Sequence, residues 1–261
     1  MLKHIVVGTD FSPGWEAACK QIPALAQILG TERFTLVHVP DVHPLSASRE
    51  VKDSVQPQLD DAARALEQLT GLPVASETHV GTAADALLAA AHDAEADAVL
   101  VASRGHSRLG GLFLGNVALN LARITDLPAL ILPDEPGPVD GPLVLATDGS
   151  DCCAAAEQLF RGLVDAAHKG LILTVSVDDQ APDHSEVLKH AKNLEQDVDN
   201  ANLEIQTGNP RELIPAIAER EHASLLIVGQ RGRTALADLL LGSTAEAACR
   251  AAHCPVMVVP D

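Results

Sequence analysis

The chain has 261 residues, of which 47% are hydrophobic and 21% charged, a balance that is typical of a folded globular protein and excludes a disordered one. Its 36 acidic and 18 basic residues give a formal net charge of −18, which repels phosphate backbones and argues against sequence-independent binding of nucleic acid. With four Phe, one Trp and no Tyr, the chain also has few rings on which unpaired bases could stack, so we expect no nucleic-acid partner.

Three features of the sequence concern where the protein resides. No stretch approaches the ~18 consecutive apolar residues of a membrane-spanning helix, so we expect no membrane partner. The apolar run after Met1 is too short for a signal peptide. Five cysteines at irregular spacing predict neither a disulfide framework nor a zinc site. Together these features predict a cytoplasmic protein.

In the first half, short aliphatic and β-branched runs alternate with Ala/Leu-rich stretches of helical spacing. We expect strands at residues 5–7, 35–39, 99–101 and 129–132, and helices at residues 59–69 and 83–94. The strands are continuously apolar, which is typical of strands buried on both faces. Repeated strand–helix–strand units predict an α/β fold with a parallel sheet and helices on both of its faces. Ligands of such sheets bind beyond the carboxyl ends of the strands.

A Pro/Gly-rich segment separates the two halves of the chain. Residues 133–142 contain four prolines and two glycines, which neither a helix nor a central strand tolerates. We therefore predict one domain at residues 1–134, a linker at 135–141 and a second domain at 142–261.

The second half repeats the first. Four pairs of segments match: Lys3–Ser12 with Pro142–Ser150, Ala98–Gly105 with Leu225–Gly232, Leu114–Asn116 with Leu241–Ser243, and Leu127–Asp134 with Cys254–Asp261. The first half carries additional residues between its second and third strands, so the pattern indicates a duplication with one insertion.

A glycine-rich motif follows the expected fourth strand of the second half. Gly229–Gly232 is followed by nine residues and then by Gly242. Glycines allow a tight turn and let a ligand approach the backbone closely. Arg231 and Arg233 add local positive charge. The pattern predicts a ligand that carries phosphate.

A helix is expected to begin directly after Ser243 and to run to Ala252. We predict Ser243 as its N-cap, and Ser243 and Glu246 have the spacing of a capping box. The N–H groups and the positive dipole end of such a helix attract anions.

The spacing of Gly229, Gly232 and Gly242, followed by Ser243, resembles the ATP-binding signature of the universal stress protein family. In the second half the turn Thr147–Ser150 and the closing strand at residues 254–259 also occur in that family's order. The resemblance covers nearly the whole chain, twice. It implies two tandem Rossmann-like (flavodoxin-like) domains, each with a five-stranded parallel sheet of strand order 3-2-1-4-5. It also implies that the chain binds ATP, or else ADP or AMP, with Mg²⁺ accompanying the nucleotide.

The resemblance implies a nucleotide site in the second half. Asp148 would lie near ribose and adenine, the backbone around Val177 would meet the adenine edge, and the glycines and Ser243 would surround the phosphates. The implied nucleotide-binding residues are Ala146, Thr147, Asp148, Val177, Gly229, Arg231, Gly232, Gly242, Ser243 and Thr244.

The first half departs from the family's motif. Ala102 stands where the first glycine is expected, and its methyl group would crowd a ribose or phosphate, or force φ out of a region that only glycine adopts. Asn116 still offers a helix cap, but Leu119 removes the capping box. We therefore predict a degenerate motif and a structural role for this half. Its candidate nucleotide-binding residues are Thr9, Asp10, Val39, Gly105, Gly115, Asn116 and Val117.

Other reactive side chains are assigned to packing. Cys249 and His253 share a helix face, but a single pair without a second cluster predicts no metal site. We expect His38 to be a hydrogen-bonded core histidine. Cys152 and Cys153 are expected to be buried apolar residues, with redox sensitivity as the alternative if they are exposed. The acidic segment 195–199 is expected to face solvent.

The sequence contains none of the usual catalytic signatures, so we predict no catalytic residues. The leading hypothesis is a nucleotide-dependent regulator of the stress response. The alternatives are a nucleotide-free interaction protein and a slow ATPase. Exposed strand edges need covering, so the last strands of the two halves, at residues 129–132 and 256–259, are expected to pair within the chain or to form a homodimer.

Overall fold

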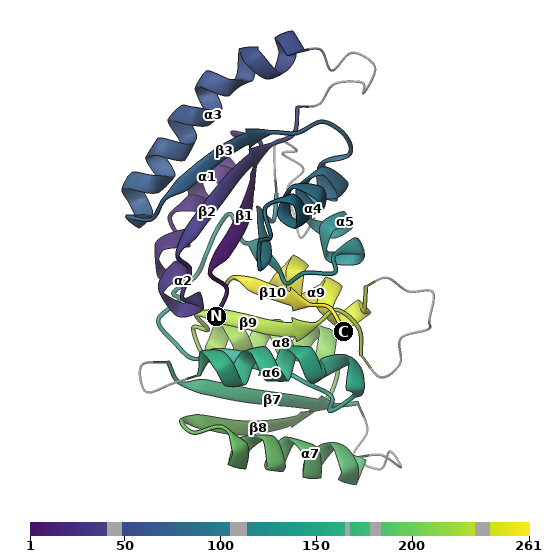
Figure 1. Cartoon of the computed structure of the whole chain (residues 1–261). Coiled ribbons are helices and arrows are strands. Elements are labelled where there is room, and N and C mark those ends of the chain that lie inside the picture. Colours follow the sequence, from purple (N-terminus) through teal and green to yellow (C-terminus); the bar gives the residue numbers. More distant parts are fainter. Residues whose placement is uncertain (41–48, 105–113, 165–167, 178–183, 233–240) are drawn as a thin grey trace. The chain divides into compact units, whose positions relative to one another are not determined.

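The computed structural model describes residues 1–40, 49–104, 114–164, 168–177, 184–232 and 241–261 (Figure 1). The chain folds as two compact units, Met1–Asp134 and Glu135–Asp261. Each unit contains a five-stranded sheet whose paired strands are all parallel. The strand orders are β3-β2-β1-β4-β5 and β8-β7-β6-β9-β10, which confirms the predicted order 3-2-1-4-5.

The first unit alternates strands and helices along the chain. Helices α1, α2 and α3 cover one face of its sheet and α4 and α5 the other (Figure 1). Its elements are β1 (His4–Thr9), α1 (Pro13–Cys19), α2 (Ile22–Leu29), β2 (Arg33–His38), α3 (Arg49–Thr70), β3 (Val74–Thr78), α4 (Ala83–Asp93), β4 (Ala98–Ala102), α5 (Asn116–Ile124) and β5 (Ala129–Leu132).

The second unit repeats this arrangement, with α6 and α7 on one face of its sheet and α8 and α9 on the other (Figure 1). A short 3-10 turn, η2, precedes α6. Its elements are β6 (Leu143–Ala146), η2 (Asp151–Cys153), α6 (Ala154–Leu163), β7 (Gly170–Ser176), α7 (His184–Asp197), β8 (Ala201–Thr207), α8 (Pro210–Arg220), β9 (Leu225–Gly229), α9 (Ser243–Ala251) and β10 (Val256–Val259).

Burial along the strands follows their place in each sheet. The strands β1, β4, β6 and β9 are buried over nearly their whole length because helices cover both faces of the sheet. The outer strands β3 and β8 instead alternate between half-buried and exposed residues. Because neither strand is a continuous apolar run, the sequence pattern does not predict them.

Helix α3 is longer than the sequence predicts. It begins ten residues before Leu59 and passes through Pro57, a residue that disfavours helix interiors. Contacts to β3 hold this part of the helix, because Gln56 Nε2 donates to Ser76 Oγ at 3.2 Å. Asp60 Oδ1 accepts hydrogen bonds from the same Ser76 Oγ at 2.6 Å and, within the helix, from Gln56 Nε2 at 2.8 Å. These hydrogen bonds, that from Ser76 foremost, lower the pKa of Asp60. A tertiary contact thus overrides the local preference for ending the helix at proline.

Candidate functional site

The turn after β6 is built around Thr147 and Asp148. Asp148 Oδ1 accepts a hydrogen bond from the N–H of Ser150 at 3.0 Å, and Thr147 Oγ1 accepts one from the N–H of Gly149, also at 3.0 Å. Gly149 has φ +68°, a left-handed conformation that favours glycine. These bonds hold the carboxylate at the carboxyl edge of the sheet, where ligands of α/β sheets bind.

The conformation of this turn leads to a test on Gly149. Gly149→Ala is expected to lower the free energy of unfolding by about 1–2 kcal/mol, because a side chain at positive φ is strained. An ideal Cβ there would also lie 3.1 Å from His190 Cδ2. Gly71 serves as control: its φ is +70°, but no described atom lies within 4 Å of its ideal Cβ. Denaturant unfolding should show a smaller loss for Gly71→Ala; equal losses would contradict a contribution from His190.

The two parts of the glycine motif come together at the same edge of the sheet. An ideal Cβ on Gly232 would lie 2.9 Å from Asp148 Oδ2, so the backbone passes directly beside this carboxylate. The N–H of Gly242 donates to the carbonyl of Gln230 at 2.8 Å, which joins the start of α9 to the turn at residues 229–232. The Asp148 carboxylate, the turn at residues 229–232 and the N-terminus of α9 therefore lie next to one another at this edge of the sheet.

Gly229 serves packing within this turn. Its ideal Cβ would lie 3.1 Å from the carbonyl oxygen of Cys152 and 3.3 Å from Cys153 Sγ, so the missing side chain makes room for η2. The residue does not adopt a positive φ. The expectation that alanine at this position forces φ out of a region reserved for glycine is therefore wrong.

In the first unit the glycine that allows the close approach lies on the helix side, at Gly14, and not in the turn after the fourth strand. Ala102 replaces Gly229, and Gly14 stands where Cys152 stands in the repeat. An ideal Cβ on Gly14 would lie 3.0 Å from the carbonyl oxygen of Arg104, the counterpart of Arg231. The close approach of helix and turn is thus kept in both units, with the glycine exchanged between them.

The predicted helix caps are wrong by one residue in both units. Gly242 is the N-cap of α9, in an extended conformation with φ −66° and ψ 144°, and Ser243 is the first helical residue. Gly115 likewise precedes α5, which begins at Asn116. Because each glycine lies against a carbonyl of the preceding turn, it is the last extended residue before the helix.

The predicted capping box of α9 is also absent. Glu246 instead accepts from Arg250 Nη2 at 2.8 Å, one helical turn further on. Gly242 has no side chain that could accept from the first N–H groups of α9. Within the described residues, no N-cap side chain therefore competes with an anion for these N–H groups.

Arg231 contributes less positive charge than expected. Its Nε donates to Asp261 Oδ1 at 2.9 Å, in a half-exposed ion pair. In the first unit Arg104 pairs with Asp134 in the same way, at 3.4 Å. Arg233 lies outside the described residues. Among the described residues, the backbone N–H groups and the dipole of α9 are therefore the features of this edge that favour an anion.

The remaining predicted residues of the second unit lie at or near this edge. Ala146 is buried at the end of β6, next to Thr147, whose N–H donates to the carbonyl of Leu173 in β7 at 3.0 Å. Val177 follows β7 and is 76% exposed, an apolar side chain open to contact at the end of that strand. Thr244 is half-buried in the first turn of α9.

The predicted residues of the first unit form a similar turn. Thr9 Oγ1 accepts from the N–H of Phe11 at 3.1 Å, and Asp10 Oδ1 from the N–H of Ser12 at 3.0 Å. Phe11 adopts φ +58°, so the left-handed turn is kept although its residue is not glycine. His38 Nδ1 is hydrogen-bonded to the carbonyl of Thr9 at 2.8 Å, as expected of a structural histidine.

The other described candidates of the first unit lie after β2 and at the start of α5. The N–H of Gly115 donates to the carbonyl of Ser103 at 2.7 Å, as Gly242 does to Gln230. Asn116 and Val117 are exposed at the start of α5, and Val39 is half-buried after β2. Gly105 lies outside the described residues.

Cys153 and Cys249 are buried as expected, whereas Cys152 is only half-buried. Burial raises the pKa of Cys249 to about 12 and that of Cys153 to about 11. Cys153 is therefore a protonated thiol at neutral pH, and its S–H donates to Asp148 Oδ1 at a distance of 3.4 Å. Within the part of the chain that the structure describes, no three His, Cys, Asp or Glu side chains are grouped so that they could hold a metal ion.

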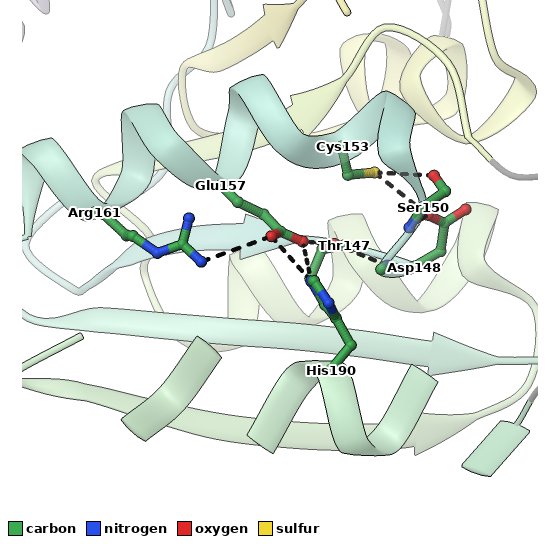
Figure 2. A network of polar contacts seen from close by, with 8 residues as sticks. Thr147, Asp148, Ser150, Cys153, Glu157, Arg161 and His190 are labelled. Atoms are coloured by element: carbon green, nitrogen blue, oxygen red, sulfur yellow. Dashed lines mark hydrogen bonds and ion pairs between the residues drawn. The ribbon is translucent and has the colours of Figure 1, made fainter. Parts of the chain in front are cut away.

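Two residues of the site were missed at the level of sequence. Glu157 on α6 is only 3% exposed and accepts a hydrogen bond from Thr147 Oγ1 at 2.7 Å, and His190 on α7 contacts the same carboxylate (Figure 2). A signal was present, because Glu157 lies one turn before the buried Phe160 and shares its helix face. A carboxylate on an apolar helix face indicates a specific buried partner.

The geometry defines a class of protein. The strand order reverses between β6 and β9, and at this switch point lie a carboxylate turn, a glycine turn and an uncapped helix start. Such sites in doubly wound α/β domains bind anionic ligands.

Comparison with known proteins identifies the family. The profile of the universal stress protein family matches residues 1–133 and 141–260, so the chain belongs to this family, with two of its domains in tandem. A universal stress protein of Mycobacterium tuberculosis is 28% identical over 98% of this chain and 96% of its own length.

Solved structures with the same fold include a universal stress protein from Archaeoglobus fulgidus, with a TM-score of 0.80 and 20% identity, covering 98% of both chains. A functionally unknown protein from Pseudomonas aeruginosa matches with a TM-score of 0.73 and 18% identity, over 100% of this chain and 93% of its own. Across the described residues, no helix is both long and apolar enough to cross a membrane.

Proposed function

We propose that the second unit binds an adenine nucleotide, with ATP as the leading candidate, and that the protein is a nucleotide-dependent regulator of the stress response in the cytoplasm. One observation carries this proposal: Gly232 passes so close to the Asp148 carboxylate that a Cβ would lie 2.9 Å from Oδ2. This approach joins a group suited to a ribose hydroxyl to a glycine turn suited to phosphate.

Each part of the ligand would have a counterpart in the residues present. The N–H groups of Ser243 and Thr244 at the start of α9 would bind phosphate oxygens, together with the backbone of Gly232. Asp148 would accept hydrogen bonds from ribose, and the exposed Val177 would pack against the base. When bound, Mg²⁺ would neutralise part of the phosphate charge.

A regulatory role is favoured over catalysis by the surroundings of the turn. Thr147 and Asp148 are engaged in hydrogen bonds that hold the turn, and the nearby Cys153 is a protonated, buried thiol. Neither arrangement supplies a general base for hydrolysis. A nucleotide that binds one conformation better than another shifts the population towards it, which is sufficient for a regulator.

The test is titration of ATP with Mg²⁺ by calorimetry, for which we expect about one site per chain. Asp148→Asn keeps an oxygen for Ser150 but replaces the charged acceptor beside Gly232 with an amide. We expect it to weaken ATP binding about tenfold, the value of one charge-assisted hydrogen bond. The matched control is Asp10→Asn in the first unit, which should leave the affinity unchanged.

Three outcomes would contradict parts of this proposal. Equal affinities of the wild type and Asp148→Asn would remove the assigned site. Purified protein without a nucleotide in native mass spectrometry, and without heat on titration, would support the nucleotide-free interaction protein. Steady phosphate release that Asp148→Asn abolishes would support the ATPase.

A further inference from the structure

Helix α7 is linked to the Asp148 turn by a buried carboxylate. We propose that Glu157 and His190 are positioning residues, which hold this turn in shape and couple occupancy of the nucleotide site to α7. The coupling to a nucleotide rests on the proposed function; the positioning of the turn does not.

Glu157 is the centre of the network (Figure 2). Its Oε1 accepts the hydroxyl proton of Thr147 at 2.7 Å, and the two carboxylate oxygens lie 2.9 and 3.0 Å from His190 Nε2. Since a carboxylate only accepts, Nε2–H is the donor. Arg161, one turn along α6, lies 4.0 Å from Oε2. The buried carboxylate is thus held by groups from three elements: the turn, α6 and α7.

The hydroxyl of Thr147 transmits this contact to the turn. It has one proton, which it donates to Glu157, and a lone pair that accepts the N–H of Gly149 at 3.0 Å. Without an acceptor at residue 157, the hydroxyl is free to rotate away from this orientation. The carboxylate therefore fixes the direction of the bond that closes the turn beside Asp148.

His190 touches the same turn directly. An ideal Cβ on Gly149 would lie 3.1 Å from His190 Cδ2 and 3.2 Å from Cγ, so the ring packs against the backbone of Gly149. Helix α7 thus meets the turn both through Glu157 and through this packing. A displacement of α7 must change both contacts.

The network belongs to the unit with the complete glycine motif. In the repeat Cys19 occupies the place of Glu157, and burial raises the pKa of this thiol to about 12. A thiol is a weak hydrogen-bonding group and cannot replace the carboxylate. Coupling is reciprocal: if the nucleotide stabilises this arrangement of α7, contacts that stabilise α7 must raise nucleotide affinity by the same factor.

Two substitutions of Glu157 separate positioning from stability. Glu157→Leu fills the space with an apolar side chain but leaves the Thr147 hydroxyl and the His190 N–H without their acceptor, so we expect it to lower the melting temperature. At temperatures well below that transition, where the variant is folded, we expect its ATP binding to be about tenfold weaker than that of the wild type. Glu157→Gln retains an oxygen for Thr147 and should restore most of the affinity. A purely structural role of Glu157 would instead leave folded Glu157→Leu with the ATP affinity of the wild type.

His190→Ala removes the link to α7, and we expect about a fivefold loss of ATP affinity. The control is His92→Ala, which removes a solvent-exposed histidine–carboxylate contact in the first unit, where Nε2 lies 3.0 Å from Asp126 Oδ1. The amide resonance of Gly149, followed by NMR without nucleotide, should move in Glu157→Leu and His190→Ala but not in His92→Ala. Hydrogen exchange in α7 should slow when ATP is added to the wild type.

The outcomes distinguish this inference from the proposed function. If the wild type binds no ATP, the proposed function fails, and the Gly149 resonance alone decides whether Glu157 and His190 position the turn. If the wild type binds ATP but Glu157→Leu and His190→Ala bind it equally well with an unmoved Gly149 resonance, the inference is overturned. Unchanged exchange in α7 on ATP binding would overturn the coupling.

Discussion

Replacing Gly242 by valine is expected to weaken ATP binding by about 100-fold, the effect of a steric cost of ~2.8 kcal/mol. An ideal Cβ on Gly242 would lie 3.2 Å from the carbonyl oxygen of Gln230 and 3.5 Å from Arg231 Cα. The two methyl groups of valine would therefore push the glycine turn away from the N-terminus of α9. The two sources of backbone N–H groups for phosphate would then be separated. Calorimetric titration with ATP measures the loss.

The duplication supplies the control for this experiment. Gly115 has the same place before α5, and an ideal Cβ there would lie 3.0 Å from the carbonyl oxygen of Ser103. Gly115→Val should thus strain the first unit to a similar extent, as measured by thermal unfolding, while ATP affinity stays at the level of the wild type. Loss of affinity in Gly115→Val, or its retention in Gly242→Val, would contradict the assignment of the site to the second unit.

Replacing Phe160 by alanine is expected to lower the free energy of unfolding of the second unit by about 3–5 kcal/mol. Phe160 is fully buried on α6, and its ring covers the start of β7: an ideal Cβ on Gly170 would lie 2.7 Å from Phe160 Cζ. The substitution leaves a cavity between this helix and the sheet. Denaturant unfolding gives the magnitude, and hydrogen exchange should show faster exchange in β6 and β7.

Phe34→Ala provides the comparison in the first unit. Phe34 is 2% exposed on β2, so its truncation also leaves a cavity and should cost a similar free energy. Its effect on hydrogen exchange should appear in β1 and β2 rather than in β7. If Phe160→Ala accelerated exchange in the first unit as strongly as in the second, the cavity could not be the local cause.

The fold could be predicted from the sequence because its signals are local. Strands such as β5 are short apolar runs, and residues 129–132 were predicted with the bounds that the structure has. The sequence pattern does not predict the outer strands β3 and β8 or the first part of α3, because the strand residues are half-exposed or exposed and this part of the helix precedes a proline. Contacts between α3 and β3 stabilise these two elements, and β8 is held by β7 and α7. Such tertiary contacts leave no periodic pattern in the sequence.

The sequence predicts which residues form the candidate site, but not the contacts that these residues make. The motif located Asp148, Gly232 and Gly242, which do lie along one edge of the sheet. The predicted cap at Ser243 was wrong because close packing of Gly242 against Gln230 determines where the helix begins. The positive charge assigned to Arg231 was likewise reduced by its ion pair with Asp261, a residue 30 positions away in the chain.

By itself the sequence determined the class of fold, the duplication and the motif that marks the second half, because periodicity and glycine spacing are properties of neighbouring residues. Only the tertiary structure decided which side chains meet. Thr147, Glu157 and His190 lie on a turn and two helices, and their hydrogen bonds exist only when the sheet brings these elements together. The burial of Glu157 makes those bonds obligatory, since a carboxylate removed from water must find its partners inside the protein.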